Sequence, residues 1–456
     1  MTSTPPLPTS TPPLPQKLLT ALAVACLIPL IDTSVVNVAI PRVVSDLNVA
    51  VDRAGWVVTG YMIATGVGMG ISAGLSRYAG LRRTWMGAMV VFTAASLVCG
   101  CAPSCDALIA ARAVQGLSGG VLTPMVQAII VAVAGRERMR DALGVIGIPA
   151  VAAPAIGPLL GGWLTTSLSW RAVFLINVPL CLVALLLEGR AIPQESHPEI
   201  SLDIIGGALL AVGLGSGLLG LSWAVEADPR PLLLCTAASI LALTVFTVHS
   251  RRVSEPILKA SLLSHRSIGT TFGLSWCVGA TFYAFLFAYP VTAHHTFGTS
   301  MTMIGMALGI QGVGAFIGRR LLATSLRTMS SFTLLSGGLI GTALTTLPFS
   351  MIDVLGNLWA VSGLFLIRGA LLGIVTIVLL GACVENVDPA DAPHASALIR
   401  IGLQIGGAAG IAATTVMVSL GTTVTFVGIS GCAGVGALLA APSALRSTPR
   451  VPAGKP

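Results

Sequence analysis

The chain has 456 residues, of which 54% are hydrophobic and 9% are charged, and its net charge is +8. A soluble domain carries about 25% charged residues, so this composition excludes a soluble protein and indicates an integral membrane protein. The basic residues are scattered over short segments between apolar runs rather than gathered in one patch. They therefore indicate membrane topology, and nucleic acid is not expected as a partner.

Apolar runs of roughly twenty residues recur along the chain after a start rich in Pro, Ser and Thr. Helices of this length cross the hydrocarbon core with every backbone group satisfied, so we expect an all-α membrane protein in the lipid bilayer. We count about fourteen spans, at residues 18–40, 54–75, 84–102, 107–133, 142–164, 171–187, 204–225, 231–249, 267–289, 302–318, 331–350, 357–383, 395–419 and 422–441.

Lys and Arg residues decide the expected orientation. With the N-terminus inside, eighteen of them fall in inner loops and tails, and four fall in outer loops. The remaining three, Arg112, Arg368 and Arg400, lie within spans, which accounts for all 25. Because basic residues accumulate on the cytoplasmic side of membrane proteins, we expect both termini to be cytoplasmic.

Two long hydrophilic breaks, at 188–203 and 250–266, divide the spans into groups of six, two and six. Secondary transporters are commonly built from such repeats. We therefore expect a six-helix bundle at 17–192, a two-helix linker at 193–265 and a second six-helix bundle at 266–441. Residues 1–16 are expected to form a disordered cytoplasmic tail, and 442–456 a second cytoplasmic tail.

One carboxylate, Asp32, lies deep inside an expected span. Ionisable residues at that depth are costly, mostly functional and usually paired. Arg112 lies roughly 8 Å below the outer end of the fourth span and Asp32 roughly 12 Å below its own, so we predict an ion pair. Gln115 falls one turn from Arg112 on the same face. The alternatives are an aspartate that only hydrogen-bonds a neighbouring helix and an arginine that extends to the outer surface.

The fifth span contains three prolines, Pro149, Pro154 and Pro158, and a set of small residues. Prolines remove backbone donors and kink a helix, while Gly157 and Gly161 fall on one face that another helix can approach closely. Gly162 follows directly. A bent helix with a smooth face suits an interface that rocks; the alternative is a helix that is kinked for structural reasons only.

These segments resemble the signatures of the major facilitator superfamily, in particular its drug:proton antiporters with fourteen spans. The resemblance covers nearly the whole chain. It rests on seven runs in the family's order: 32–41, 112–116, 157–162, 170–179, 202–206, 255–256 and 404–407.

The resemblance implies a major facilitator fold of two six-helix bundles with two extra central helices. It implies alternating access, in which proton entry drives a small-molecule substrate out, and coupling between Asp32 and Arg112. It also implies that Pro154, Gly157, Pro158, Gly161 and Gly162 form the antiporter motif of the fifth span. The proton gradient would be the energy source, with no cofactor.

A cytoplasmic gate loop between the second and third spans is also implied, with Arg77, Gly80, Arg82 and Arg83. Related sequences usually carry an acidic residue where Arg77 stands, and that acid is thought to latch the two bundles. Its replacement by a cation leaves open whether the latch exists here.

The second bundle carries two cations within spans, Arg368 and Arg400, with no acidic residue at comparable depth. Facing a cavity, they would attract an anionic or carbonyl-rich substrate; the alternative is a structural role in hydrogen bonds to backbone carbonyls. Polar residues expected near the same cavity are Asn37, Gln311 and Gln404.

The sequence favours a bacterial inner-membrane exporter of small lipophilic compounds, such as drugs or metabolites, driven by protons. It contains no GxxxxGK[ST] loop, so ATP is not expected as a partner. No nucleophile–base or metal set is visible, so an enzyme is not expected. Two alternatives stay open: an uncoupled facilitator or importer of the same fold, and a membrane sensor or scaffold without transport.

Overall fold

The computed structural model describes residues 16–188, 192, 203–225, 229–253, 256–326, 329–351, 358–383, 387 and 391–444. Within these ranges all regular secondary structure is helical, and the expected tails fall almost wholly outside them. The first half contains α1 (Gln16–Leu47), α2 (Val51–Ala79), α3 (Leu81–Gly100), α4 (Cys105–Ser167), α5 (Ala172–Leu175) and α6 (Asn177–Glu188). A hairpin of α7 (Ile204–Val225) and α8 (Pro229–Arg252) follows. The second half contains η1 (Ala260–Ser264), α9 (Arg266–Phe297), α10 (Met301–Thr324), α11 (Ser331–Thr346), η2 (Leu347–Met351), α13 (Leu358–Ala382), α14 (Ala392–Leu420) and α15 (Thr422–Ala444).

Ten helices in the described part are long and apolar enough to cross a membrane, and two shorter apolar helices cover Ala172–Leu186 and Ile204–Gly217. The protein is therefore a multi-pass membrane protein, as the composition predicted. The two remaining expected spans, 107–133 and 142–164, both fall on α4. The count of fourteen and the cytoplasmic position of both termini stay predictions.

Helix α4 is 63 residues long and holds two of the expected spans. A straight helix of that length would extend about 95 Å, roughly three times the thickness of the hydrocarbon core. Yet Arg112, near its start, contacts Asp32 of α1, and Gly157, near its end, lies against Ser34 of the same helix. The α4 chain must therefore fold back on itself between these two residues.

The boundary between α2 and α3 differs from the expected gate loop. Helix α2 continues to Ala79 and α3 begins at Leu81, so a single residue, Gly80, makes the turn. Its φ of 83° lies in the region that favours glycine. Thr84 Oγ1 donates to the carbonyl of Leu75 across the turn, at 3.0 Å. The predicted loop is thus mostly helix. The predicted sixth span is also divided, into α5 and α6, at Ile176.

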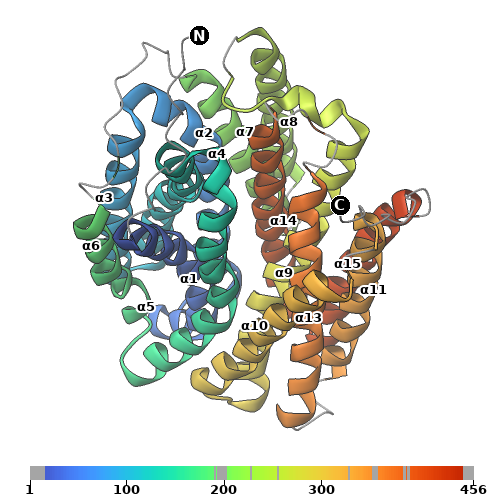
Figure 1. Cartoon of the computed structure of the whole chain (residues 1–456). Helices are drawn as coiled ribbons and strands as arrows, with labels where there is room; N and C mark the ends of the chain where they lie inside the picture. Colours follow the sequence, from blue (N-terminus) through green and yellow to red (C-terminus); the bar gives the residue numbers. More distant parts are fainter. Residues whose placement is uncertain are drawn as a thin grey trace, which may run out of the picture.

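The two halves lie side by side, with the α7–α8 hairpin between them at one end (Figure 1). Glycines allow close contact across the interface between the two halves, called the seam below. A Cβ at Gly162 of α4 would clash with the Met301 backbone of α10, and a Cβ at Gly305 of α10 would clash with the Pro158 backbone of α4. Gly55 of α2 likewise lies against Thr415 of α14. These contacts give the halves a smooth, side-chain-poor interface.

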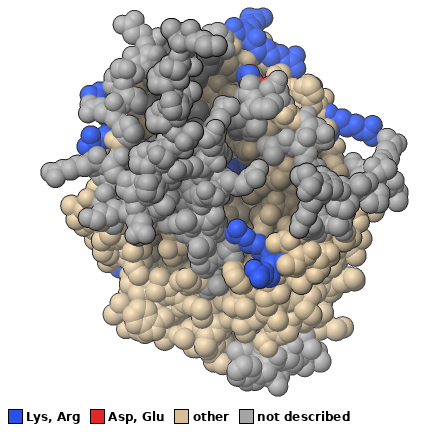
Figure 2. Space-filling view, in the orientation of Figure 1, with Lys and Arg blue, Asp and Glu red and all other residues tan. Residues whose placement is uncertain are grey.

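Helix α7 covers the seam where α2 meets α14. Leu210 and Leu214 of α7 share one apolar cluster with Val67 of α2 and Leu398 of α14. The hairpin is therefore packed against both halves. Several exposed Lys and Arg side chains lie toward the upper part of the face shown in Figure 2, and acidic side chains are scarce there.

Candidate functional site

Asp32 and Arg112 form a buried ion pair inside the first half. Arg112 Nη1 donates to Asp32 Oδ2 at 2.5 Å, and both side chains are 0% exposed. The other carboxylate oxygen, Asp32 Oδ1, accepts from Gln115 Nε2 at 3.1 Å and from Asn177 Nδ2 at 2.7 Å. Three helices, α1, α4 and α6, therefore meet at one carboxylate. Helix α2 joins the network through the Val57 carbonyl, which accepts from Arg112 Nε at 3.1 Å.

A second group of side chains fixes Arg112 and Gln115. The guanidinium lies over the Tyr61 ring, 3.7 Å from its centroid. Gln115 Oε1 accepts from Arg112 Nη1 at 2.7 Å, and Gln115 Nε2 also donates to Ser96 Oγ at 2.8 Å. The thiol of Cys99 is 3.6 Å from Gln115 Oε1. Hydrogen bonds and a cation–π contact thus hold the guanidinium in one orientation.

Local sequence explains why the helices approach closely enough for this network. Gly116 and Gly120 on α4 face the α2 backbone at Tyr61 and Thr65, where a Cβ would clash with carbonyl oxygens. Gly68 of α2 faces Leu117 of α4 in the same way. Small residues that let backbones approach are the usual means of helix packing in lipid. Arg112 therefore lies one helical turn from a tight α2–α4 contact.

The predicted antiporter motif lies on α4 between α1 and the opposite half. A Cβ at Gly157 would clash with Ser34 Oγ, and a Cβ at Gly161 would lie 2.7 Å from the Val35 carbonyl oxygen of α1. Pro158 and Gly162 face α10 instead. One face of the motif thus packs against α1 at Ser34, two residues after Asp32, and the other face packs against α10 of the second half. The side chain of Pro154 lies outside the described residues.

The predicted gate residues do not form one described cluster. The Arg77 side chain lies outside the described residues, so the question of the missing acidic latch stays open. Gly80 is the buried turn between α2 and α3, Arg82 is half-buried and Arg83 is exposed.

Arg368, predicted to face a substrate cavity, is instead fully buried at 0% exposure in a cage of neutral groups. Its Nε donates to Thr346 Oγ1 at 3.0 Å, its Nη1 to Gln311 Oε1 at 2.9 Å and its Nη2 to the Thr281 carbonyl at 3.0 Å. The guanidinium lies 3.6 Å from the centroid of Phe285. In this conformation the structural alternative fits Arg368 better than the cavity prediction.

The other predicted cavity residues are spread out. Asn37 is fully buried and its Nδ2 donates to the Thr33 carbonyl at 2.6 Å, so it does not line an open space. Gln404 is half-buried beside Gly66, at the seam between α14 and α2. Arg400 is half-buried on α14. The structure brings Arg368 and Gln311 into contact, while Asn37 lies on α1 and Arg400 and Gln404 lie on α14.

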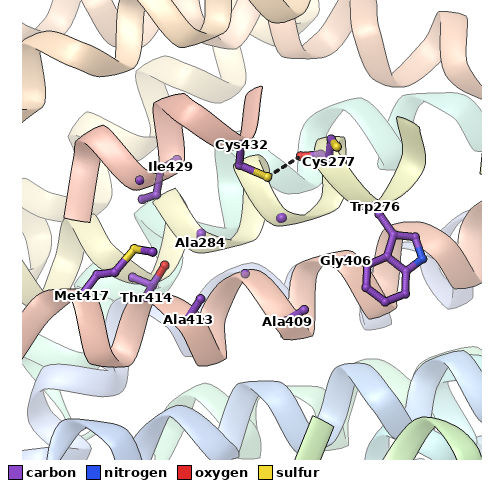
Figure 3. A pocket seen from close by; sticks show the side chains of 13 residues that line it. Trp276, Cys277, Ala284, Gly406, Ala409, Ala413, Thr414, Met417, Ile429 and Cys432 are labelled. Atoms are coloured by element: carbon purple, nitrogen blue, oxygen red, sulfur yellow. Dashed lines mark hydrogen bonds between the residues drawn. The ribbon is translucent and has the colours of Figure 1, made fainter. Parts of the chain in front are cut away.

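A pocket lies elsewhere in the second half, between α9, α14 and α15 (Figure 3). It encloses about 330 Å³ and none of the five predicted cavity residues lines it. Its walls are small or apolar, with Ala280, Ala409, Gly410 and Ala413 at the α9–α14 contact. Such walls can take up an apolar group, but they offer no charged side chain to select one.

Sequence reasoning missed three parts of the Asp32 network. Asn177 is within a run that carries the family resemblance, but only the structure shows that it contacts Asp32. Ser96 and Tyr61 carry no sequence signal beyond being polar or aromatic within a span. A polar residue deep in a span is the one signal that could have found Asn177 and Ser96.

Comparison with known proteins agrees with this fold. The model of the Major Facilitator Superfamily matches residues 22–411. The chain is 30% identical to a multidrug resistance protein B homolog of Mycobacterium tuberculosis, over 85% of this chain and 73% of that protein. It is 31% identical to the cephamycin export protein CmcT of Amycolatopsis lactamdurans, over 89% and 86% of the two chains.

Solved structures give the same fold at lower identity. The POT family transporter PepTSo superposes with a TM-score of 0.71 at 13% identity, covering 96% of this chain and 100% of that one. A D-xylose–proton symporter superposes with a TM-score of 0.67 at 14% identity, covering 93% and 97%. These two structures support the fold alone. With the family model matched over most of its length, the chain belongs to the major facilitator superfamily.

Proposed function

We propose that this protein exports small lipophilic compounds across the bacterial inner membrane in exchange for protons, by alternating access. The observation that carries the proposal is the Asp32–Arg112 pair, buried within the membrane-spanning part of the first half. A carboxylate in that position can exist as the anion beside Arg112 or, with one proton, as a neutral acid. These two states have different interaction energies with Arg112.

The position of the pair supports coupling to movement. Asp32 is on α1, and two residues later Ser34 packs on Gly157 of α4, whose next residue Pro158 contacts α10 of the opposite half. A change in the α1–α4 contact therefore lies one helix away from the seam that has to open. Protonation of Asp32 and opening of the seam would therefore both involve the contact between α1 and α4.

The names of relatives support export and the substrate class. The M. tuberculosis relative is named for multidrug resistance, and the A. lactamdurans relative for cephamycin export. Both are similar over most of their own length. An apolar pocket within the spans is compatible with lipophilic compounds.

The test uses purified protein in proteoliposomes with an imposed pH gradient and a panel of cationic, neutral and anionic lipophilic compounds. The expected result is accumulation of at least one compound that depends on the gradient and stops when a protonophore collapses it. Flux that is insensitive to the protonophore would favour an uncoupled facilitator. Absence of flux for every compound, with folded protein, would favour the sensor or scaffold.

A further inference from the structure

The two carboxylate oxygens of Asp32 have different surroundings. Oδ1 accepts two amide N–H groups, from Gln115 and Asn177, whereas Oδ2 accepts only Arg112 Nη1. Each carboxylate oxygen offers about two lone-pair positions, so those of Oδ1 are filled. A proton can bind Oδ1 only when one of these two amide donors turns away, and the neutral acid then no longer attracts Arg112 as an anion.

A protonated Asp32 carries a new O–H donor in a buried site, and a buried donor without an acceptor is costly. Gln115 Oε1 already accepts from Arg112 Nη1 and faces the Cys99 thiol. By contrast, Asn177 Oδ1 is fully buried and has no hydrogen-bond partner among the residues that the structure describes. The amide that carries this oxygen is already in contact with Asp32, through its nitrogen.

We propose that Asn177 is a positioning residue that holds Asp32 in both of its protonation states. With Asp32 ionised, Asn177 Nδ2 donates to the carboxylate. When Asp32 gains a proton, the Asn177 amide turns about its last side-chain bond, its N–H leaves Asp32 Oδ1, the proton binds that oxygen, and Asn177 Oδ1 accepts from the new O–H. One proton is added to the carboxylate and no other covalent bond forms or breaks. The proposal rests on the proton coupling proposed above for Asp32.

Protonation of Asp32 should affect the α1–α6 contact and the α1–α4 contact differently. Asn177 is the first residue of α6, so its bond to Asp32 ties α6 to α1 in either state. The Arg112 bond, which ties α4 to α1, loses its ionic character when Asp32 gains a proton. The proton would thus loosen the α1–α4 contact while the α1–α6 contact persists.

Infrared difference spectroscopy of the purified protein, titrated with acid, tests the proposal without depending on transport. The carboxylic C=O stretch of protonated Asp32 is identified as the band that disappears in Asp32→Asn. In Asn177→Leu, which has neither donor nor acceptor, we expect this band at higher frequency because its O–H has lost its partner.

Three further variants complete the test. Cys181→Ala, a buried substitution one turn further along α6, should leave the frequency of the band as in the wild type. Asn177→Ser, which keeps a hydroxyl donor and acceptor, should fall between wild type and Asn177→Leu, and it serves if the leucine variant does not fold. Asn37 Oδ1 is also buried and has no partner within the described part of the chain. A shift in Asn37→Leu and none in Asn177→Leu, or no shift in either, would overturn the proposal.

Proton-driven export that survives in Asp32→Asn would refute the proposed function, whereas the infrared result would still decide the role of Asn177.

Discussion

Arg112 and Arg368 lie in similar cages in opposite halves of the protein, but only Arg112 faces a carboxylate. In each cage Nη1 donates to a glutamine Oε1, at 2.7 Å and 2.9 Å. In each, the guanidinium lies over an aromatic ring, at 3.7 Å and 3.6 Å from the centroid. Among the described residues Arg368 has no ion-pair partner, and its hydrogen bonds all go to neutral oxygens. The second cage shows that neutral groups can hold a buried guanidinium in this fold.

The two arginines should therefore differ in what their loss costs. Arg112→Met leaves Asp32 buried without a counter-charge, a change that destabilises proteins by about 3–5 kcal/mol. Arg368→Met removes a buried charge and leaves mainly the neutral Gln311 oxygen unsatisfied, at a cost of about 1–3 kcal/mol. Thermal unfolding in detergent should show the larger loss for Arg112→Met. Adding Asp32→Asn to Arg112→Met should recover part of it. Equal losses for the two arginines, or no recovery, would contradict this reading of the pair.

The α1–α4 contact should be sensitive to size at one position. A Cβ at Gly157 would clash with Ser34 Oγ and lie 2.9 Å from Ser34 Cβ. We expect Gly157→Ala to destabilise the protein by about 1–3 kcal/mol and to slow export. Because the obstacle is one side chain, Ser34→Gly in the same protein should restore most of the loss. Measuring export and the unfolding temperature for both single variants and the double variant checks this; additive losses would rule it out.

A larger residue at the seam should have a different effect, because there the added Cβ would meet backbone atoms rather than a side chain. A Cβ at Gly162 would clash with the Met301 carbonyl of α10, which cannot give way by a change of rotamer. Gly162→Ala should therefore push α4 and α10 apart at the end where Thr302 Oγ1 donates to Thr166 Oγ1 at 3.1 Å. Spin labels at these two threonines, in a background with the native cysteines replaced, should report a larger share of long distances. Gly337→Ala, where a Cβ meets nothing within 4 Å, is the matched control and should leave the distances unchanged.

The α7–α8 hairpin should depend on pH through Asp203. Burial raises the pKa of this carboxyl, but hydrogen bonds from His249 and from the backbone N–H groups of Gly206 and Ile257 outweigh it, so the pKa is lowered from 3.8. A lowered folded pKa gives stability that is present above the unfolded value and is lost as pH falls through the folded value. Asp203→Asn should therefore cost about 1–3 kcal/mol at neutral pH, and its difference from wild type should begin to shrink below about pH 4 and disappear only below the lowered pKa of the folded protein.

Unfolding measured from pH 3 to pH 7 tests this, with Asp106→Asn as the control. Asp106 is 69% exposed in its pair with Arg53, and exposed pairs of this kind contribute about 0–1 kcal/mol. A difference for Asp203→Asn that does not change with pH would show that its charge is not what stabilises the hairpin.

The sequence carried the membrane class and the ion pair because both depend on strong, local signals. Hydropathy marks a span whatever its neighbours, and a carboxylate in a span is costly enough to imply a partner. Arg112 was identifiable because it is the single basic residue in the fourth span. Its depth could be worked out from helix rise alone.

What the sequence could not supply depends on three-dimensional packing. Asn177 contacts Asp32 only because α5 ends at Leu175 and α6 begins at Asn177, a break that hydropathy does not register. Arg368 looked suited to a cavity because no acid accompanies it, whereas the structure surrounds it with Thr346, Gln311 and a carbonyl. Gly80 was expected in a loop, and its positive φ lets two helices meet at one residue. Because the partners of Arg368 are neutral, the sequence contains no opposite charge from which they could be predicted.

The most direct test of the account is the release of protons when a transported compound binds to the purified protein. In weakly buffered detergent solution, a compound from the export panel should displace protons from the wild type in proportion to the amount bound. The release should be larger at a pH where Asp32 is mostly protonated. Asp32→Asn should still bind the compound but release no protons. Equal proton release from the two proteins would contradict the assignment of Asp32 as the proton carrier.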